Sequence, residues 1–285
     1  MTEEAAAGPA ASNSTTKPLR IVHLFPRTLG MNGEGGNVDI LRRRAESRGL
    51  AVDVQRVEDG DVVSPDADLV FIGSGPVSAQ IETEPWVEAV SPALHDLADR
   101  GVPFLAVGGG FQLLGEWVRL ADGRELEGAG IFPVTTTVAG ERVVGDFVIE
   151  SRLGTLVGFE NRGSSIDIGQ ASPVGRVVYG RGNVPATGPG ASASAAAIAA
   201  SGGTAAGTVL VAPDDRVEGY WVGNLIGTHL HGPVLANNPV LADWLLEAAL
   251  ARRGDPLPPA TGDLEEIDRR ASEARATIMA APLSE

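Results

Sequence analysis

The chain has 285 residues, of which 43% are hydrophobic, and carries a formal net charge of −15. The apolar content suffices for one large domain or two small ones, and the acidic balance disfavours nucleic acid or an anionic membrane as the main partner. The absence of cysteine excludes disulfides and thiolate metal sites. No apolar run approaches the roughly 20 residues of a membrane span, and the N-terminus lacks the apolar core of a signal peptide. We therefore expect a cytoplasmic protein without membrane insertion.

The first part of the chain alternates short apolar runs with helix-compatible segments. Residues 1–18, rich in Ala, Ser and Thr, are predicted to form a disordered tail. Strands are predicted at 19–25, 52–57, 69–72 and 104–107, and helices at 38–48 and 86–100. This alternation, with short connections, predicts an α/β fold in which a mostly parallel sheet is covered by helices on both faces.

One stretch organises the chain, and it runs from Phe104 to Gly115. An apolar run of strand type enters Gly108-Gly109-Gly110, and a helix-compatible segment, 112–120, follows. Strand, tight glycine turn and helix is the layout of a nucleophile elbow. The N–H of the residue after the turn then serves an oxyanion hole. Three glycines alone are also compatible with an ordinary turn or a phosphate loop.

Two further motifs allow alternative interpretations. The loop 30–37 is rich in glycine, which suits a phosphate site, but no P-loop Lys follows. His229 and His231 would share one face of a strand and could bind zinc, but no third ligand is evident. We expect neither a metal site nor a cofactor.

The second half of the chain contains predicted strands at 128–131 and 142–150. Residues 185–207 are mostly Ala, Gly, Ser, Thr and Pro, which predicts a flexible insertion. A helix at 240–253 closes the fold, and a charged helix follows at 263–279. We therefore expect one domain over 19–252 and a partly helical tail over 253–285.

These motifs resemble the class I glutamine amidotransferases of the cobyric-acid-synthase type, and among them the GatD-like glutaminase subunit of lipid II isoglutaminyl synthase. The elbow of that subunit reads Ala-(Ile/Val)-Cys-Gly-Gly-Tyr-Gln-Leu-Leu-Gly, and residues 106–115 differ from it at Gly108 and Phe111. Further similar segments lie at 33–46, 142–146, 158–163 and 227–233. The resemblance covers 19–252 apart from the insertion, and implies a three-layer domain.

The resemblance implies a role for several residues. His231 corresponds to the catalytic base, and Gly108 lies where the family has its nucleophilic Cys. The predicted oxyanion groups are the N–H groups of Gly75 and Gly109; Pro76, beside Gly75, has no N–H to donate. The predicted substrate-binding residues are Arg142, whose guanidinium can pair with a carboxylate, and Gln112. Without the resemblance, Arg142 would be interpreted as an exposed strand residue.

Three functional interpretations follow. In the first, the chain is the amidotransferase-like subunit of a complex, with glutamine as a possible ligand, and a Mur-ligase-like partner activates D-glutamate in lipid II for amidation. In the second, it is a non-catalytic homologue that stabilises or regulates a ligase partner; in the third, the pocket serves an unrelated use. Glycine cannot form a glutamyl thioester, so Gly108 predicts that the chain has lost glutaminase activity. Differences at Pro76, Phe111 and Arg162 favour drift over a designed replacement.

Overall fold

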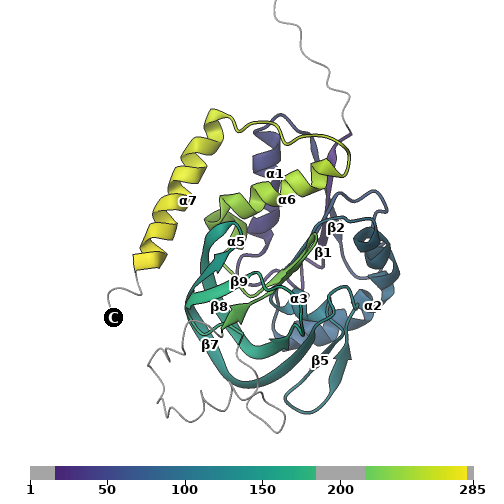
Figure 1. The fold of residues 1–285 in the computed structure, drawn as a ribbon. Coiled ribbons are helices and arrows are strands. Elements are labelled where there is room, and N and C mark those ends of the chain that lie inside the picture. Colours follow the sequence, from purple (N-terminus) through teal and green to yellow (C-terminus); the bar gives the residue numbers. More distant parts are fainter. Residues whose placement is uncertain (1–16, 184–215, 281–285) are drawn as a thin grey trace, which may run out of the picture.

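The computed structural model describes residues 17–183 and 216–280 (Figure 1). The predicted insertion at 185–207 and nearly all of the predicted N-terminal tail lie outside these residues. The side chains of residues 139–141 are also outside the description. Among the described helices, none combines the length and the apolar character that crossing a bilayer requires.

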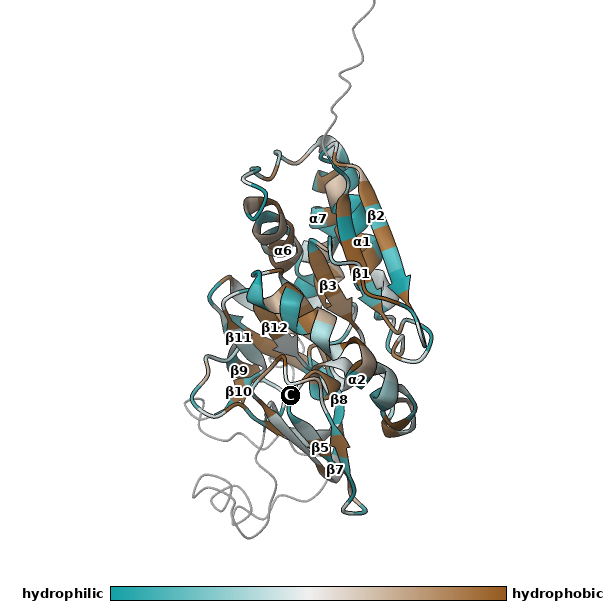
Figure 2. Ribbon diagram, turned by 90° about the vertical axis from the view of Figure 1, so that its right-hand side faces the viewer, coloured by the Kyte–Doolittle hydropathy of each residue, from teal (hydrophilic) through white to brown (hydrophobic). Residues whose placement is uncertain are grey.

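A six-stranded sheet lies at the centre of the domain, with the strand order β11-β12-β4-β3-β1-β2. Its strands are β1 (Leu19–Leu24), β2 (Val52–Val57), β3 (Leu69–Ile72), β4 (Phe104–Val107), β11 (Tyr220–Val222) and β12 (Leu225–Thr228). All neighbouring pairs are parallel except β11 with β12. The inner strands β3 and β12 are mainly apolar, whereas the edge strand β2 alternates in hydropathy (Figure 2), as its half-exposed position requires.

Successive residues of the central strands pack into different cores, as a pleated strand dictates. The helices are α1 (Gly35–Glu46), α2 (Val77–Asp99), α3 (Gly109–Leu113), α5 (Val234–Asn237), α6 (Pro239–Ala251) and α7 (Gly262–Ala280). Ile21 and Phe71 belong to the core under α1, α5 and α6, whereas Val22 and Val70 belong to the core under α2 and α3. The sheet is thus a middle layer between helices, which confirms the predicted three-layer α/β fold with a mostly parallel central sheet.

A second, mainly antiparallel sheet extends the domain beyond the central one, with β8 paired to β7 and the order β10-β9-β7-β5-β6. Its strands are β5 (Trp117–Arg119), β6 (Glu125–Glu127), β7 (Thr135–Ser151), β8 (Gly154–Asp167), β9 (Gly175–Tyr179) and β10 (Val217–Glu218). The long hairpin of β7 and β8 has a register irregularity between Val138 and Val143. The hairpin places residues from both of its strands beside the carboxyl edge of the central sheet.

Three local predictions were wrong. The helix after the glycine turn ends at Leu113, and the chain then enters β5, because the N–H of Glu116 bonds to the carbonyl of Val134 beside β7. The strand predicted at 128–131 lies instead at 125–127, where it pairs with β5. Helix α2 begins at Val77 and contains Pro85 and Pro92 in its interior; burial of its N-terminal part outweighs the preference of proline for helix ends.

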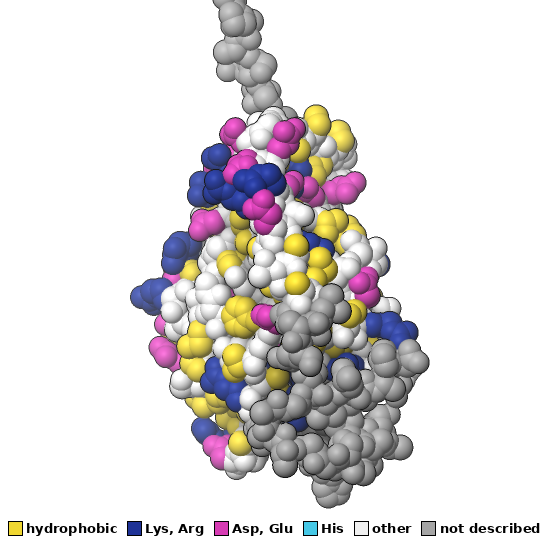
Figure 3. All heavy atoms as spheres, turned by 90° about the vertical axis from the view of Figure 1, so that its left-hand side faces the viewer, with side chains coloured by type: hydrophobic (Ala, Val, Ile, Leu, Met, Phe, Trp, Pro, Cys, Tyr) yellow, Lys and Arg dark blue, Asp and Glu magenta, His cyan; other side chains and the backbone are white. Residues whose placement is uncertain are grey.

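Helix α7 lies against the domain and is held there by buried ion pairs. Arg44 of α1 is buried and donates to Asp243 of α6 at 2.7 Å and to Asp268 of α7 at 2.5 Å. Arg275 of α7 donates to the side chain of Asn238 at 2.7 Å. In the side view of Figure 3, basic and acidic side chains alternate in the upper part of the surface, so this region carries no large field of one sign.

Candidate active site

The glycine turn lies at the carboxyl edge of the central sheet, between β4 and α3. Gly108 has φ +52° and ψ −117°, a backbone conformation that strains any residue with a side chain. Its N–H donates to the carbonyl oxygen of Thr228 at 2.8 Å, and the N–H of Gly110 donates to the carbonyl oxygen of Gly73 at 2.9 Å. The neighbouring parallel strands therefore fix the sharp turn that the sequence predicts.

His231 faces this turn. A Cβ atom built on Gly108 would lie 2.7 Å from its Cε1 atom, so the structure brings together the two residues that were predicted as base and nucleophile position. The imidazole is buried, and its Nε2 has no hydrogen-bond partner among the described residues. This nitrogen is therefore available to a ligand or a reacting group.

Glu34 orients the imidazole from the other side. Its Oε1 lies 2.7 Å from Nδ1 of His231, and its Oε2 accepts a bond from Asn37 at 2.8 Å. When ionised, the Glu34 carboxylate only accepts hydrogen bonds, so Nδ1 then carries the proton and Nε2 keeps its lone pair, the tautomer that a general base needs. Burial raises the pKa of Glu34, while the hydrogen bonds from His231 and Asn37 oppose the rise.

Glu34 was not predicted, because the family pattern places a carboxylate, if any, close after the histidine. The residue lies instead in the glycine-rich loop, almost 200 positions earlier in the chain. Gly36 makes the approach feasible: a Cβ atom there would lie 2.5 Å from the Pro233 ring. An acidic residue within that loop was the signal that could have identified it.

A chain of amide side chains links the histidine to Arg142. The Arg142 guanidinium donates to Asn161 Oδ1 at 2.8 Å, and Asn161 Nδ2 donates to Asn32 Oδ1 at 3.2 Å. Asn32 Nδ2 lies 3.4 Å from Nδ1 of His231. Arg142 is exposed and the two asparagines are half-buried, so this row of side chains runs from the exposed mouth of the site toward the buried histidine.

A cavity of about 260 Å³ opens between the turn and the β7–β8 hairpin. It is lined by Met31, Asn32, Ser74, Gly75, Pro76, Val77, Gln80, Gly108, Gly109, Gln112, Val138, Arg142, Asn161, Arg162, Gly163, Ser164 and His229. All predicted oxyanion and substrate residues are among them. The volume lies near the lower end of the range for small-molecule pockets, which suits a ligand the size of an amino acid.

The two predicted oxyanion groups lie beside each other, but one is occupied. The N–H of Gly109 donates to the hydroxyl of Ser74 at 3.1 Å. The nitrogen of Gly75 lies 3.2 Å from the Cβ position of Gly109. Pro76 is the N-cap of α2 and is exposed. Its lack of an N–H therefore does not remove either of the two predicted oxyanion donors, Gly75 and Gly109.

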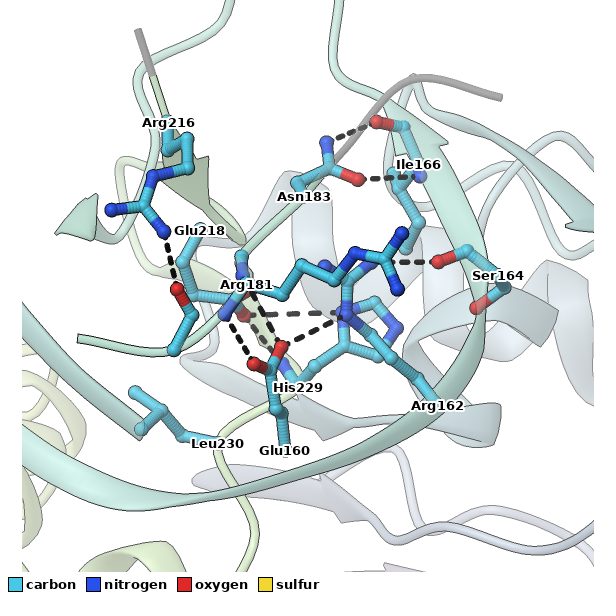
Figure 4. Close-up of polar contacts among 12 residues, drawn as sticks. Glu160, Arg162, Ser164, Ile166, Arg181, Asn183, Arg216, Glu218, His229 and Leu230 are labelled. Carbon is cyan, nitrogen blue, oxygen red and sulfur yellow. Dashed lines mark hydrogen bonds and ion pairs between the residues drawn. The ribbon is translucent and has the colours of Figure 1, made fainter. Parts of the chain in front are cut away.

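The cavity floor is a buried polar network (Figure 4). Arg162 donates to the carbonyl of Ser164 at 2.6 Å and lies 3.5 Å from Glu160. Glu218 accepts bonds from the hydroxyl of Thr228 at 3.0 Å and the N–H of His229 at 2.5 Å. Burial raises the pKa of Glu218, and the positive charge of Arg162 is the largest opposing influence. Arg162 thus provides positive charge for both buried carboxylates, and the buried Arg216 provides more for Glu160.

Gln112 and His229 are part of this floor. Nε2 of Gln112 donates to the Ser164 hydroxyl at 2.8 Å and lies 3.2 Å from Nε2 of His229. Burial holds the pKa of His229 well below its ordinary value, so this imidazole is neutral. The predicted substrate role of Gln112 stays a prediction, since its amide is already bonded within the protein. Within residues 17–183 and 216–280, no three acidic or histidine side chains form a metal site.

The site combines a buried histidine that faces the turn, a guanidinium at its mouth and adjacent backbone donors. It has no reactive side chain at the turn, since Gly108 carries none and the chain has no cysteine. A step that needs a side-chain nucleophile therefore has no group at this position.

Comparisons with known proteins agree with this geometry. The profile of the CobB/CobQ-like glutamine amidotransferase domain matches residues 20–239. The lipid II isoglutaminyl synthase (glutamine-hydrolyzing) subunit GatD of Staphylococcus aureus is 34% identical over 257 residues, or 89% of this chain and 91% of that protein. The protein of the same name from Streptococcus pneumoniae is 29% identical over 242 residues, or 82% of each chain.

Solved structures of glutamine amidotransferases are similar at lower identity. One has a TM-score of 0.49 at 12% identity, over 80% of this chain and 98% of that one. Another, from Thermotoga maritima, has a TM-score of 0.46 at 14% identity, over 92% and 94%. The family profile covers most of the domain, and the S. aureus relative is matched over nearly its whole length. The chain therefore belongs to the CobB/CobQ-like glutamine amidotransferase family, as a relative of the GatD subunits of lipid II isoglutaminyl synthase.

Proposed function

We propose that this chain is the glutamine-binding subunit of a two-chain enzyme that amidates D-glutamate in lipid II, and that it has itself lost glutaminase activity. One observation carries the second half of the proposal. The turn that faces the oriented His231 holds Gly108, and the chain has no thiol anywhere. Amide hydrolysis on this scaffold begins with attack by a side-chain sulfur, which a glycine cannot supply.

The retained polar groups support binding of glutamine. A guanidinium at the mouth can pair with the α-carboxylate of an amino acid, and Arg142 lies there beside Asn161. His231 faces the elbow, and its Nε2 has no partner among the described residues, so it can accept a bond from an amide that reaches Gly108. The charged residues that line the cavity are Arg142 and Arg162, so its charge pattern favours a ligand with a carboxylate.

The names of the relatives support a partner chain. Both GatD proteins are named as subunits of lipid II isoglutaminyl synthase, and we propose a Mur-ligase-like chain as the partner here. That partner would use ATP to activate the D-glutamate carboxylate for attack by ammonia. A partner that consumes ATP works in the cytoplasm, where we place the complex.

A second candidate function is a regulatory one, in which the chain stabilises the ligase and reports the presence of glutamine. The observation that favours it is the combination of an intact binding wall with an elbow that has no nucleophile. In that case ammonia comes from solution or from another protein, and the chain contributes through its interface alone.

Co-purification tests the partnership. The chain and the Mur-ligase-like protein encoded by the same organism are co-expressed and passed over a size-exclusion column at micromolar concentration. Elution of both proteins in one peak of the summed mass is the expected result. Separate elution of two folded proteins would contradict the proposal.

A further inference from the structure

The space in front of Gly108 is already occupied. A Cβ atom on this glycine would lie 2.4 Å from Ser74 Oγ and 2.9 Å from Ser74 Cβ. Both separations are far below van der Waals contact for atoms that are not hydrogen-bonded. Ser74 supplies two of the three nearest atoms, and Cε1 of His231 at 2.7 Å is the third. As long as Ser74 keeps this place, no residue with a side chain fits at position 108; without Ser74, the imidazole must still shift slightly.

The same hydroxyl takes the backbone donor of the elbow. Ser74 Oγ accepts the hydrogen bond of the Gly109 N–H at 3.1 Å. In an elbow this N–H points to the oxygen that becomes negative during attack on an amide. One buried side chain therefore fills the nucleophile's space and also satisfies the donor that would stabilise the transition state.

The backbone of Ser74 has little room to retreat. Its carbonyl accepts the N–H of Met31 at 2.9 Å. On either side, a Cβ atom at Gly73 would lie 2.3 Å from the Leu29 carbonyl oxygen, and one at Gly75 would lie 2.8 Å from that of Thr28. The loop is thus packed against 28–31, and only rotation of the serine side chain could clear part of the space, because its Cβ stays in place.

We propose that Ser74 is a positioning residue that takes the nucleophile's place, and that Ser74 and Gly108 form one coupled pair which keeps the pocket in a binding-only form. Under this proposal the elbow lacks activity for two reasons, the missing side chain and the occupied donor. Restoring a thiol at 108 alone is then insufficient, because the clash and the bonded donor both remain. The inference deepens the proposed function, and its link to glutamine rests on that function.

The absence of cysteine makes the test clean, since a cysteine introduced at 108 is the single thiol of the chain. Four variants are compared with the unmodified protein: Gly108→Cys, Ser74→Gly, the double variant Gly108→Cys/Ser74→Gly, and the matched control Gly108→Cys/Ser78→Gly. Ser78 is exposed at the start of α2, so its replacement also adds a glycine without touching the elbow. Alkylation by iodoacetamide is followed by mass spectrometry as a function of pH.

The expected result is a thiol in the double variant that reacts at least about tenfold faster at neutral pH than the thiol of Gly108→Cys. Removal of Ser74 clears the space beside the thiol and frees the Gly109 N–H at the start of α3, and a neighbouring donor or an imidazole that takes the proton favours the thiolate. The control should behave like Gly108→Cys. Unfolding by urea should give non-additive effects, with Ser74→Gly increasing the folded-to-unfolded ratio of the Gly108→Cys chain by about tenfold, as coupled neighbours do. If Gly108→Cys does not fold, recovery of folded protein by Ser74→Gly but not by Ser78→Gly supports the same coupling.

Three outcomes contradict the proposal. The first is equal alkylation of the introduced thiol in the single and double variants, and the second is additive stability effects of the two substitutions. The third is ammonia release from glutamine by the unmodified chain that Ser74→Ala abolishes, since Ser74 would then be a nucleophile itself. A double variant with a reactive thiol but without ammonia release would support the coupling of Ser74 and Gly108. It would count against glutamine binding, and therefore against the proposed function.

Discussion

Two walls of the same cavity differ in what they contain. The base wall combines the bonded pair of Glu34 and His231, which faces Gly108, with Asn32 and Asn161, which line the cavity and are bonded to each other and to Arg142. The elbow wall, formed by residues 73–75 and 108–110, has the backbone geometry of a catalytic turn but no reactive group. The difference shows that orientation of a ligand and reaction with it depend on separable parts of the site.

The contrast has a physical reason. Glu34 and His231 of the base wall are buried and bonded to each other, so the loss of one leaves the other unpaired, at a cost of about 1–3 kcal/mol. The nucleophile of an elbow is a single side chain that points into the cavity, and its loss leaves only space, which a neighbouring hydroxyl can fill. A site can therefore lose its chemistry while its binding wall is kept by folding stability.

The largest effect is expected at the floor that supports both walls. Arg162→Met removes the ion pair of Glu160 with Arg162 and the positive charge that opposes the burial of Glu218, and breaking a buried pair in this way costs about 3 kcal/mol. Urea denaturation measures the free energy of unfolding. The control Arg42→Met, whose ion pairs on α1 are exposed, should cost about 0.5 kcal/mol or less. Equal losses for the two variants would contradict the buried network as described.

The next effect separates the mouth of the cavity from the floor. Arg142→Ala should weaken glutamine binding by roughly tenfold or more, since a hydrogen bond to a charged group contributes about 1.5–3 kcal/mol. Its free energy of unfolding should change little, because the side chain is exposed and bonds only to Asn161. Calorimetric titration with glutamine provides the affinity. Arg119→Ala on β5, which does not line the cavity, is the control, and an equal affinity of the two variants would refute the role of Arg142.

The smallest effect concerns the pH dependence of the base wall. Burial raises the pKa of Glu34 above its ordinary value of 4.5, so above this pH the folded chain holds a proton that the unfolded chain has released. The contribution of Glu34 to stability is therefore present at low pH and falls as the pH rises through the folded pKa.

The variant Glu34→Gln lacks this titration. Its free energy of unfolding should increase relative to that of the unmodified chain as the pH is raised from 4.5 to 8, and urea curves at several pH values measure the difference. Asn32→Ala, which also removes a contact of His231 but no titrating group, should give a curve parallel to that of the unmodified chain. A parallel curve for Glu34→Gln would show that the carboxylate is not buried as described.

Several features could be predicted from the sequence because they depend on local pattern. The apolar run into three glycines determines the turn at Gly108, and the alternation of strands and helices determines the central sheet. His231 was identified through a short motif whose glycine and proline neighbours fix the backbone around it. The turn and the histidine motif are local signals, whereas the central sheet follows from the order of its elements, because it pairs distant residues such as Phe104 of β4 and Leu225 of β12.

The missed features depend on contacts between distant segments. Glu34 meets His231 across 197 positions, and a serine after a strand, such as Ser74, has the sequence signature of an ordinary turn. The second sheet arises from pairing of β7 with β5, β8 and β9, whose register no local period encodes. Helix α2 passes through Pro85 and Pro92 because its buried face stabilises it, which a propensity rule cannot include.

The central claim is that the cavity binds glutamine and does not hydrolyse it. The most direct measurement uses glutamine labelled with ¹⁵N at its side-chain amide, incubated with a stoichiometric amount of the purified chain and followed by NMR. The account predicts that the amide signal broadens or shifts on binding, and that no ¹⁵N-ammonium accumulates beyond a rate about 10⁶-fold below that of an intact triad. Steady accumulation of ¹⁵N-ammonium by the unmodified chain would contradict it.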